Sequence, residues 1–435
     1  MVVSDVLPAV LADLTSGLHR GVVVDSPPGA GKSTLVVRAT SSMVSSGQLP
    51  LMIVAQTNEQ VDDLIARLVP ALPPGVGIGR LSAQGYVAPP RVAQHASVTV
   101  GSKVADLGPA LIVIGTAAKW ATLSEGQWPW AIVDEAYQMR SDMLLRIANR
   151  FDKALFVGDP GQLDPFSVVE SERWTGLTWD PMQSAVAVLL RHNPDLPVHR
   201  LPVSWRLPYS AAPVVSQAFY PFAEFTSGTG EGDRRLSLST SGVGGGAVDA
   251  AVEMAAATGW ALYELPSQHT LRTDAEAAAA CAALAQRVVE RGAVAYSEVA
   301  PDGAPVTEAR VAIGAAHRDQ VAAIRSYLPE SSEITVDTAN RLQGREYDVT
   351  IVLHPLSGRR DATAFHLESG RLCVLASRHR HACIVVARAG IPELLDAHPS
   401  TEPVHLNVPV KFPDGWEANQ AIMAHLHGHR VRDSG

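Results

Sequence analysis

The segment SPPGAGKST, at residues 26–34, constrains the fold of this chain more than any other part of the sequence. It follows an apolar run at 21–24 and leads into another at 35–37. A buried strand that passes through a glycine-rich turn directly into a helix is the setting of a phosphate-binding loop. The alternative, an ordinary Gly/Pro turn before a helix, explains GKST after a strand less well. Ser26 stands where the strict pattern has its first glycine, so its backbone would be strained if φ were positive there.

The residue types in this loop suit a nucleoside triphosphate. Gly29 and Gly31 allow successive backbone N–H groups to point at phosphate oxygens. Lys32 can reach the β and γ phosphates, and the hydroxyl of Ser33 is a ligand for Mg²⁺. We therefore predict that a nucleoside triphosphate and Mg²⁺ bind here, with contacts from Pro28, Gly29, Ala30, Gly31, Lys32, Ser33 and Thr34.

Composition narrows the class of protein. The 435 residues suit two or three domains, and 46% hydrophobic with 18% charged residues is typical of a globular chain. A net charge of −9 argues against a uniformly basic nucleic-acid coat but leaves room for a local basic cleft. Three scattered cysteines do not suit a disulfide framework, and no apolar run is long enough to span a bilayer. Asp5 and Asp13 interrupt the first apolar stretch, which has no basic residues typical of a signal peptide, so we do not expect one. We expect a cytoplasmic protein without a membrane partner.

The first half, residues 1–195, is predicted to form one α/β domain with a parallel sheet. Short apolar runs alternate with helical patterns, and each run ends in polar residues or glycine. The functional residues of such sheets gather at the carboxyl ends of the strands. The Pro/Gly-rich region at about 70–108 is predicted to be a small irregular or antiparallel insertion. The predicted strands span 22–25, 51–55, 111–115, 131–134 and 154–158.

Polar side chains follow the second and third predicted strands. Thr57 and Asn58 suit either the N-cap of the next helix or a contact with a phosphate, and the sequence does not choose between these roles. Thr116 is followed by Lys119 and Trp120. A cation beside an aromatic ring can hold nucleic acid, but a buried tryptophan is the commoner arrangement.

Two adjacent carboxylates, Asp134 and Glu135, close the fourth predicted strand. Nucleotide hydrolysis needs one carboxylate to hold Mg²⁺ and another to orient and deprotonate the attacking water. We assign Asp134 to the metal and Glu135 to the water. After the fifth strand, Gln162 suits sensing of the γ-phosphate and Phe166 suits support of a base, with a plain Gly/Pro loop as the alternative.

The second half, residues 196–390, repeats the α/β pattern without a phosphate loop. Residues 227–246 are rich in Gly and Ser and are predicted to form a mobile loop. The remainder, 391–435, is a C-terminal extension, and its histidines at 425, 427 and 429 are interpreted as an exposed, disordered tail rather than as metal ligands. The predicted strands span 260–265, 310–314, 334–337, 349–354 and 383–387, and the clearest helix spans 274–291.

Arg206 and Arg378 are candidate groups for phosphoryl transfer. Each lies beside polar or small residues near the end of a predicted element. Charge that builds up during phosphoryl transfer is stabilised by a guanidinium, and an arginine from a second domain links that chemistry to domain closure. The alternative for either residue is an ordinary surface arginine.

Nine motifs, in their family order, resemble those of the superfamily 1B helicases. The similarity is to the branch of the nonsense-decay RNA helicases and of the nuclease-helicases of lagging-strand maturation, and it extends from about residue 21 to 388. The combination of DEAYQ, a DEAxQ motif, with QGREYD is highly specific. The resemblance implies an AAA-type core of two tandem RecA-like P-loop domains. The motifs are SPPGAGKST, IVAQTNEQVDDL, VIGTAAKW, IVDEAYQ, VGDPGQLDPF, LPVSWRLP, IGAAHRDQV, VDTANRLQGREYDVTIV and GRLCVLASRHR.

The resemblance also implies roles for single residues. Lys32 and Ser33 would contact phosphate and Mg²⁺, with Asp134 as metal holder, Glu135 as base and Gln162 as γ-phosphate sensor. Arg206 and Arg378 would be arginine fingers. Trp205 would stack on adenine, Glu346 would bind the ribose, and Gly344 would lie beside the nucleotide. The resemblance implies contacts with the nucleic-acid backbone for Thr57, Asn58, Thr116 and Thr338. Phe166, as the support of a base, is added to these predicted nucleic-acid contacts.

On this basis we expect an ATP- and Mg²⁺-dependent motor that is monomeric, binds single-stranded DNA or RNA, moves 5′ to 3′ and unwinds duplexes. An alternative is a nucleic-acid-responsive ATPase switch or remodeller without processive unwinding, which the short insertion favours. An inactive scaffold conflicts with Lys32, Asp134, Glu135 and Gln162. DNA and RNA are not distinguished, because backbone contacts and stacked bases serve both.

Overall fold

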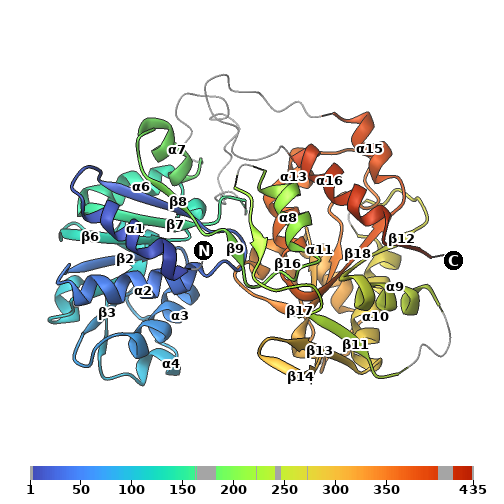
Figure 1. Cartoon of the computed structure of the whole chain (residues 1–435), viewed down its shortest axis with the longest axis horizontal. Helices are drawn as coiled ribbons and strands as arrows, with labels where there is room; N and C mark the ends of the chain where they lie inside the picture. The colour runs from blue at the N-terminus through green and yellow to red at the C-terminus, as the bar shows by residue number, and fades with distance from the viewer. Residues whose placement is uncertain are drawn as a thin grey trace. The chain divides into compact units, whose positions relative to one another are not determined.

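The computed structural model describes residues 3–161, 163, 183–221, 223–240, 246–271, 273–399 and 415–433. The chain divides into two compact units (Figure 1). The first comprises Met1–Pro160 with Asp164–Pro202, and the second comprises Gly161–Leu163 with Val203–Gly435. The sequence predicts a domain boundary near 196, and the first compact unit continues to Pro202.

An eight-stranded parallel sheet forms the centre of the first unit, in the order β4-β3-β5-β2-β6-β7-β1-β8. All five predicted strands are present, and the predicted α/β architecture is confirmed. The register pairs Asp25 with Gly158 and Asp134 with Val157, so the carboxyl ends of three central strands meet at one edge. The strands are β1 (Gly21–Asp25), β2 (Leu51–Ala55), β3 (Ile78–Leu81), β4 (Val98–Gly101), β5 (Ile112–Thr116), β6 (Trp128–Asp134), β7 (Phe151–Gly158) and β8 (Val198–Arg200).

Helices cover both faces of this sheet. Val22 and Val24 of β1 pack with the first four helices, while Val23 packs with the next three, because side chains alternate along a strand. Trp120 is buried and its Nε1 donates to the Ile53 carbonyl at 3.0 Å, as expected for a core tryptophan. The helices are α1 (Val3–Thr15), α2 (Lys32–Ser45), α3 (Asn58–Leu68), α4 (Pro90–Ala93), α5 (Ala117–Trp120), α6 (Ser141–Ile147) and α7 (Ala185–His192), with 3₁₀ turns η1 (Val69–Ala71), η2 (Val104–Leu107), η3 (Ala136–Gln138) and η4 (Ala148–Arg150).

The region at 70–108 differs from the prediction. It is not an irregular or antiparallel insertion: β3 pairs in parallel with β5, and β4 pairs in parallel with β3. Each of these strands has only four residues, and the chain between them contains Gly85, Pro89 and Pro90. Short strands set among Pro and Gly give a sequence pattern typical of a loop, which explains the wrong prediction.

The second unit contains a six-stranded parallel sheet in the order β16-β15-β17-β18-β12-β19. All five predicted strands of this half are present. A small antiparallel sheet of β11, β13 and β14 and a two-stranded pair of β9 and β10 accompany it. The strands are β9 (Val203–Ser204), β10 (Thr226–Ser227), β11 (Arg235–Leu238), β12 (Trp260–Leu265), β13 (Ala293–Ser297), β14 (Ala300–Pro305), β15 (Val311–Ala315), β16 (Thr335–Thr338), β17 (Tyr347–Leu353), β18 (His379–Arg388) and β19 (Arg430–Arg432).

Two apolar core clusters lie in the second unit. One includes Val215, Leu372 and Ile422, and the other includes Leu284 and Ile351. The predicted helix at 274–291 is α10, and the side chain of Asp274 caps it by accepting a hydrogen bond from the Ala277 N–H. The helices are α8 (Ala212–Phe219), α9 (Ala247–Thr258), α10 (Ala275–Glu290), α11 (Arg318–Arg325), α12 (Ala339–Leu342), α13 (Ala364–Leu367), α14 (Ser369–Ala376), α15 (Ile391–Ala397) and α16 (Gly415–His427), with the 3₁₀ turn η6 (Glu308–Arg310).

Two predictions for the second unit are wrong. Part of the expected mobile loop at 227–246 forms β11, which pairs with β13. The expected disordered tail contains α16 and β19, and β19 extends the main sheet beside β12. His425 of α16 packs edge-on against Trp260 with ring centroids 5.4 Å apart.

No helix in the described part of the chain is long and apolar enough to cross a membrane.

Candidate nucleotide site

The predicted phosphate loop connects β1 to α2. Gly29 and Gly31 have φ values of 71° and 93°, and Gly31 is the N-cap of α2. Positive φ is the backbone region that glycine adopts without a steric penalty, which accounts for the two glycines. The Ser26 N–H donates to the Gly158 carbonyl at 2.8 Å and thereby joins the loop to β7. Among the described non-glycine residues only Glu135 has positive φ, so Ser26 carries no such strain.

Lys32 and Glu135 form an ion pair at the end of this loop. Lys32 Nζ lies 2.6 Å from Glu135 Oε1, and both side chains are largely buried. Burial by itself lowers the pKa of Lys32, but the charges of Glu135, Asp134 and Asp159 outweigh it and raise that pKa. Lys32 is therefore a fixed positive charge among carboxylates.

Gln138 holds the other oxygen of the same glutamate. Its Nε2 donates to Glu135 Oε2 at 2.8 Å. Glu135 has a left-handed backbone with φ 52°, which is uncommon for a residue other than glycine. The carboxylate is thus held at both oxygens, by Lys32 and Gln138. Gln138 was not among the predicted site residues, and its spacing of three from Glu135 within DEAYQ is the signal that marks it.

Asp134 lies beside this pair. Its Oδ1 accepts a hydrogen bond from the Glu135 N–H at 2.9 Å. Burial and the neighbouring charge of Glu135 raise the pKa of Asp134 to about 6. Burial and the repulsion between two neighbouring carboxylates both disfavour the ionised form. A cation bound there would relieve that repulsion.

The residues near Asp134 fit Mg²⁺ bound together with a nucleotide. No group of three or more His, Cys, Asp or Glu side chains suited to a metal occurs among the described residues. Mg²⁺ is usually bound by one or two carboxylates together with substrate phosphates and water. Asp134 and the hydroxyl of Ser33, in the first turn of α2, are oxygen donors of that kind.

Tyr137 connects the DEAYQ motif to the strand before the loop. Its hydroxyl is 2.6 Å from Asp25 Oδ1, and both residues are buried. Ala136, the first residue of η3, lies close to Gly158. A Cβ atom on Gly158 would lie only 2.8 Å from the Tyr137 ring and would clash with it. Gly158 therefore lets the end of β7 approach this motif.

Three predicted nucleic-acid contacts of the first unit have roles within the fold. Thr57 is the N-cap of α3 and forms a capping box with Gln60. Asn58 Oδ1 accepts a hydrogen bond from buried Arg80 at 3.0 Å. Thr116 caps α5 by accepting from the Lys119 N–H at 3.2 Å. For Thr57 the N-cap reading is therefore correct, and a further contact with nucleic acid stays a prediction. Gln162 and Phe166 lie outside the described residues.

In the second unit, Trp205 and Arg206 follow β9. Trp205 is 43% exposed. Arg206 Nε donates to Glu346 Oε2 at 3.0 Å, which brings together two predicted nucleotide contacts. Burial raises the pKa of Glu346, but Arg206 and Arg380 outweigh it and lower that pKa. Gly344, just before Glu346 in the chain, has φ 82° in an open position.

Arg378 and Thr338 lie elsewhere in this unit. Arg378 is buried, and its guanidinium donates to the Val374 carbonyl at 3.1 Å and to Ser377 Oγ at 3.0 Å. Because Arg378 is 0% exposed, its proposed contact with phosphate would require it to become accessible. Thr338 ends β16 at the N-cap of α12, and its side chain makes no capping hydrogen bond. Both roles stay predictions.

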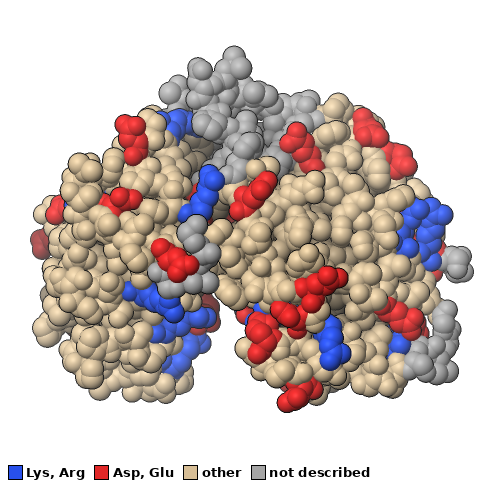
Figure 2. Space-filling view, viewed as in Figure 1, with Lys and Arg blue, Asp and Glu red and all other residues tan. Residues whose placement is uncertain are grey.

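Charge is unevenly distributed on the first unit. Figure 2 shows Lys and Arg side chains gathered over α3 and α4. Arg67 lies in the last turn of α3 and Arg91 in α4. Arg91 pairs with Glu59 at 2.7 Å and with Asp63 at 3.2 Å, so part of this positive charge is neutralised.

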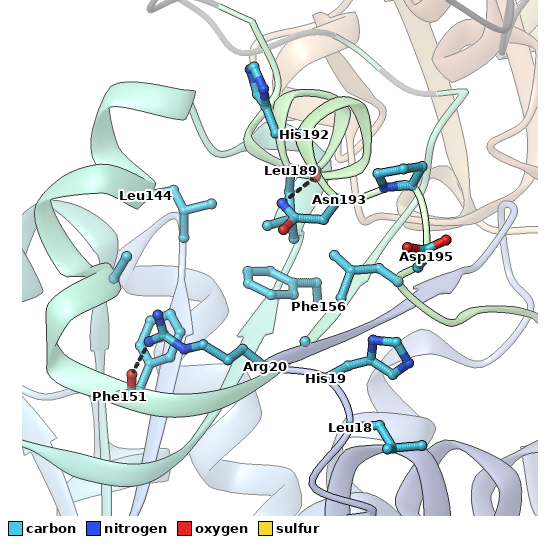
Figure 3. Close-up of a pocket in the computed structure, with 14 residues that line it drawn as sticks. Leu18, His19, Arg20, Leu144, Phe151, Phe156, Leu189, His192, Asn193 and Asp195 are labelled. Carbon is cyan, nitrogen blue, oxygen red and sulfur yellow. Dashed lines mark hydrogen bonds between the residues drawn. The ribbon is translucent and has the colours of Figure 1, made fainter.

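A cavity of the first unit lies away from the phosphate loop. It has a volume of about 610 Å³ and is lined by Gly21 and Phe151, the first residues of β1 and β7 (Figure 3). Arg20 at its wall donates to the Phe151 carbonyl at 3.1 Å. The cavity therefore lies at the amino ends of the strands, whereas the loop follows the carboxyl end of β1. The loop's chemistry, rather than this cavity, identifies the candidate site.

Residues 252–390 match a family model described as an AAA domain. This segment lies within the second unit and runs from α9 to the residues after β18. It covers less than half of the chain. No curated protein matches the sequence.

The chain is similar to several solved helicase structures. Nonstructural protein 10 (helicase) of an arterivirus, alone and in complex with DNA, is 14% identical with a TM-score of 0.45, over 84% of this chain. The helicase of PRRSV is 14% identical with a TM-score of 0.43, over 98% of this chain. The matches cover 59%, 60% and 66% of those proteins, so the chain spans about three fifths of their length.

Proposed function

We propose that the chain is an ATP-dependent helicase motor of superfamily 1B that moves 5′ to 3′ along single-stranded DNA or RNA. The observation that carries this proposal is the placement of Glu135 between Lys32 and Gln138, beside Asp134, at the end of the phosphate loop. Nucleotide hydrolysis requires a phosphate-binding lysine, a metal-binding carboxylate and a base, and these candidates lie together at one edge of the sheet. The AAA-domain match agrees with a nucleotide-dependent enzyme.

In the proposed mechanism, the loop N–H groups and Lys32 bind the β and γ phosphates of ATP. Asp134 and Ser33 would hold Mg²⁺, which when bound neutralises charge on the phosphate oxygens. Glu135 orients the attacking water and accepts its proton, while Gln138 keeps the carboxylate in place. If ATP draws Lys32 away from Glu135 toward its phosphates, binding of ATP frees this oxygen of the base for its role.

The second unit supplies the remaining groups in this proposal. Arg206 and Arg378 stabilise charge on the transferred phosphoryl group, and Trp205 offers its exposed ring to adenine. Glu346 and Gly344 lie near the ribose, and Gln162 senses the γ-phosphate.

The single strand is held by contacts from Thr57, Asn58, Thr116, Phe166 and Thr338.

A second candidate is an ATPase switch that grips nucleic acid without separating duplexes. Residues of the region at 70–108 extend the main sheet as β3 and β4 instead of forming a separate accessory domain. A wedge that splits a duplex has therefore no evident source in the described part of this region.

Two assays with the full chain separate these functions. A translocase displaces streptavidin from the 3′ end of a biotinylated single strand in the presence of ATP, and a helicase also displaces a strand from a 5′-tailed duplex. Lys32→Ala serves as the inactive control in both. Displacement from the 5′ end alone would contradict the proposed direction. ATP hydrolysis without either displacement would favour the switch.

A further inference from the structure

Arg234 donates hydrogen bonds to the backbone of the loop that carries Trp205 and Arg206. Its side chain is fully buried in the second unit, just before β11. Its Nη2 donates to the Trp205 carbonyl at 2.6 Å, and its Nη1 donates to the Arg206 carbonyl. One guanidinium therefore holds the two consecutive residues that are proposed to contact the base and the phosphate.

Glu298 fixes Arg234 in turn. It lies between β13 and β14 and accepts from Arg234 Nε at 3.0 Å and from Nη2 at 2.5 Å. This two-point pairing with the guanidinium lowers the pKa of Glu298 to about 2, so the carboxylate is ionised throughout the physiological range. The small antiparallel sheet thus provides an anchor for the Trp205–Arg206 loop.

A second arginine closes the network into a ring. Arg380 of β18 lies 3.5 Å from Glu298 and 3.2 Å from Glu346, and Glu346 pairs with Arg206 Nε. Arg206 is thereby held at its backbone by Arg234 and at its side chain by Glu346. Its Nη1 is buried and has no hydrogen-bond partner among the described residues, which leaves the N–H groups of this nitrogen for an anionic ligand.

We propose that Arg234 is a positioning residue for nucleotide turnover, acting through the orientation of Trp205 and Arg206. The inference rests on the proposed function, since it requires these two residues to contact a nucleoside triphosphate. Arginine suits this position because its planar fork reaches both Glu298 oxygens and two carbonyls together. Lysine would keep the charge but presents its donors from a single point.

Arg291 provides a matched control in the same unit. Its side chain is also buried. It pairs with the carboxylates of Asp249 at 2.6 Å and Glu253 at 3.0 Å, and it donates to the Thr240 carbonyl at 2.9 Å. None of these partners belongs to the proposed site. Arg291→Lys therefore removes an equivalent set of bonds without touching the Trp205–Arg206 loop.

The test measures kcat and KM for ATP in the full chain with saturating single-stranded oligonucleotide, together with the midpoint of thermal unfolding. We expect Arg234→Lys to lower kcat at least about tenfold and to raise KM, because small displacements of catalytic groups have large effects on rate. Arg206→Lys should lower kcat further. Arg291→Lys should lower only the unfolding midpoint and leave kcat and KM within about twofold of wild type.

The outcomes distinguish this inference from the proposed function. Two results would overturn the positioning role while leaving an active ATPase. One is an equal kcat in Arg234→Lys and Arg291→Lys. The other is a reduced kcat in Arg234→Lys with normal turnover in Arg206→Lys. A wild-type chain without ATPase activity would overturn both. If Arg234→Lys does not fold, Glu298→Gln decides: a reduced kcat supports the role, and an unchanged kcat contradicts it.

Discussion

Lys32 Nζ lies 2.6 Å from Glu135 Oε1, so the proposed phosphate ligand and the proposed base of hydrolysis neutralise one another. Gln138 occupies the second oxygen of Glu135. A nucleotide that draws Lys32 to its phosphates releases one oxygen of the base while the other stays anchored. The pairing therefore couples substrate binding to the availability of the base.

Replacing Glu135 tests the assignment of the base. Glu135→Gln keeps the size of the side chain but cannot accept the proton of water, so ATP turnover should fall about 10²- to 10⁴-fold. ATP binding should persist or become tighter, because Lys32 no longer has an anionic competitor. Steady-state hydrolysis and equilibrium binding of ATP measure the two effects. Glu59→Gln, which changes an exposed glutamate on α3, is the control, and normal turnover in Glu135→Gln would contradict the assignment.

The raised pKa of Asp134 predicts a pH-dependent stability difference. Because the folded state holds the proton more tightly than the unfolded state, ionisation of Asp134 destabilises the fold. This effect is absent below about pH 4 and complete above about pH 6. Asp134→Asn should therefore be more stable than wild type by roughly 2–3 kcal/mol at pH 7 and equally stable near pH 4.

Thermal unfolding of both proteins between pH 4 and pH 8 measures this difference, and effects of other groups cancel in the comparison. A difference that does not change with pH would contradict the environment found for Asp134. In addition, Mg²⁺ added together with ATP at pH 7 should raise the unfolding midpoint of wild type more than that of Asp134→Asn, since a ligand stabilises only the form that binds it.

Gly31 and Gly47 separate backbone strain from loop function. Both have positive φ, 93° and 72°, where alanine is strained. A Cβ on Gly31 would also lie 3.1 Å from Val3 Cγ2, whereas Gly47 has open space. Each alanine variant should lose about 1 kcal/mol or more of stability, but only Gly31→Ala should lose ATP binding. Unfolding and ATP affinity are the readouts, and equal ATP affinity in the two variants would speak against the phosphate loop.

Thr57 and Thr338 should differ in what they contribute. Thr57→Ala removes the capping box of α3 and should lower stability by about 0.5–2 kcal/mol. Thr338 makes no capping bond, so Thr338→Ala should leave stability within about 0.5 kcal/mol and weaken the binding of single-stranded nucleic acid. Fluorescence anisotropy with a labelled oligonucleotide measures the binding. Unchanged affinity in Thr338→Ala would remove this residue from the proposed contacts.

The ten predicted strands were accessible from the sequence because buried parallel strands are near-continuous apolar runs, as in β2, where every residue is apolar and buried. β4 has no fully buried residue and lies at the edge of its sheet, so it lacks this signal. α16 and β19 were missed because the partners that bury them, such as Trp260, lie far away in the sequence.

The convergence of Lys32, Asp134 and Glu135 follows from one rule: the ends of neighbouring parallel strands share an edge. The supporting contacts do not follow from it. Arg234 binds backbone carbonyls 28 and 29 residues away, and a carbonyl leaves no trace in the residue types. Thr57 shows a different limit of the sequence. Threonine suits both an N-cap and a phosphate contact, so the residue type alone did not decide between these roles.

The most direct test of the account is the rate of ATP hydrolysis by the full chain, titrated with single-stranded DNA and then with single-stranded RNA of equal length. At least one of the two should raise the rate severalfold in a saturable manner, and Glu135→Gln should abolish the increase. A rate that neither strand changes, or an increase that persists in Glu135→Gln, would contradict the account.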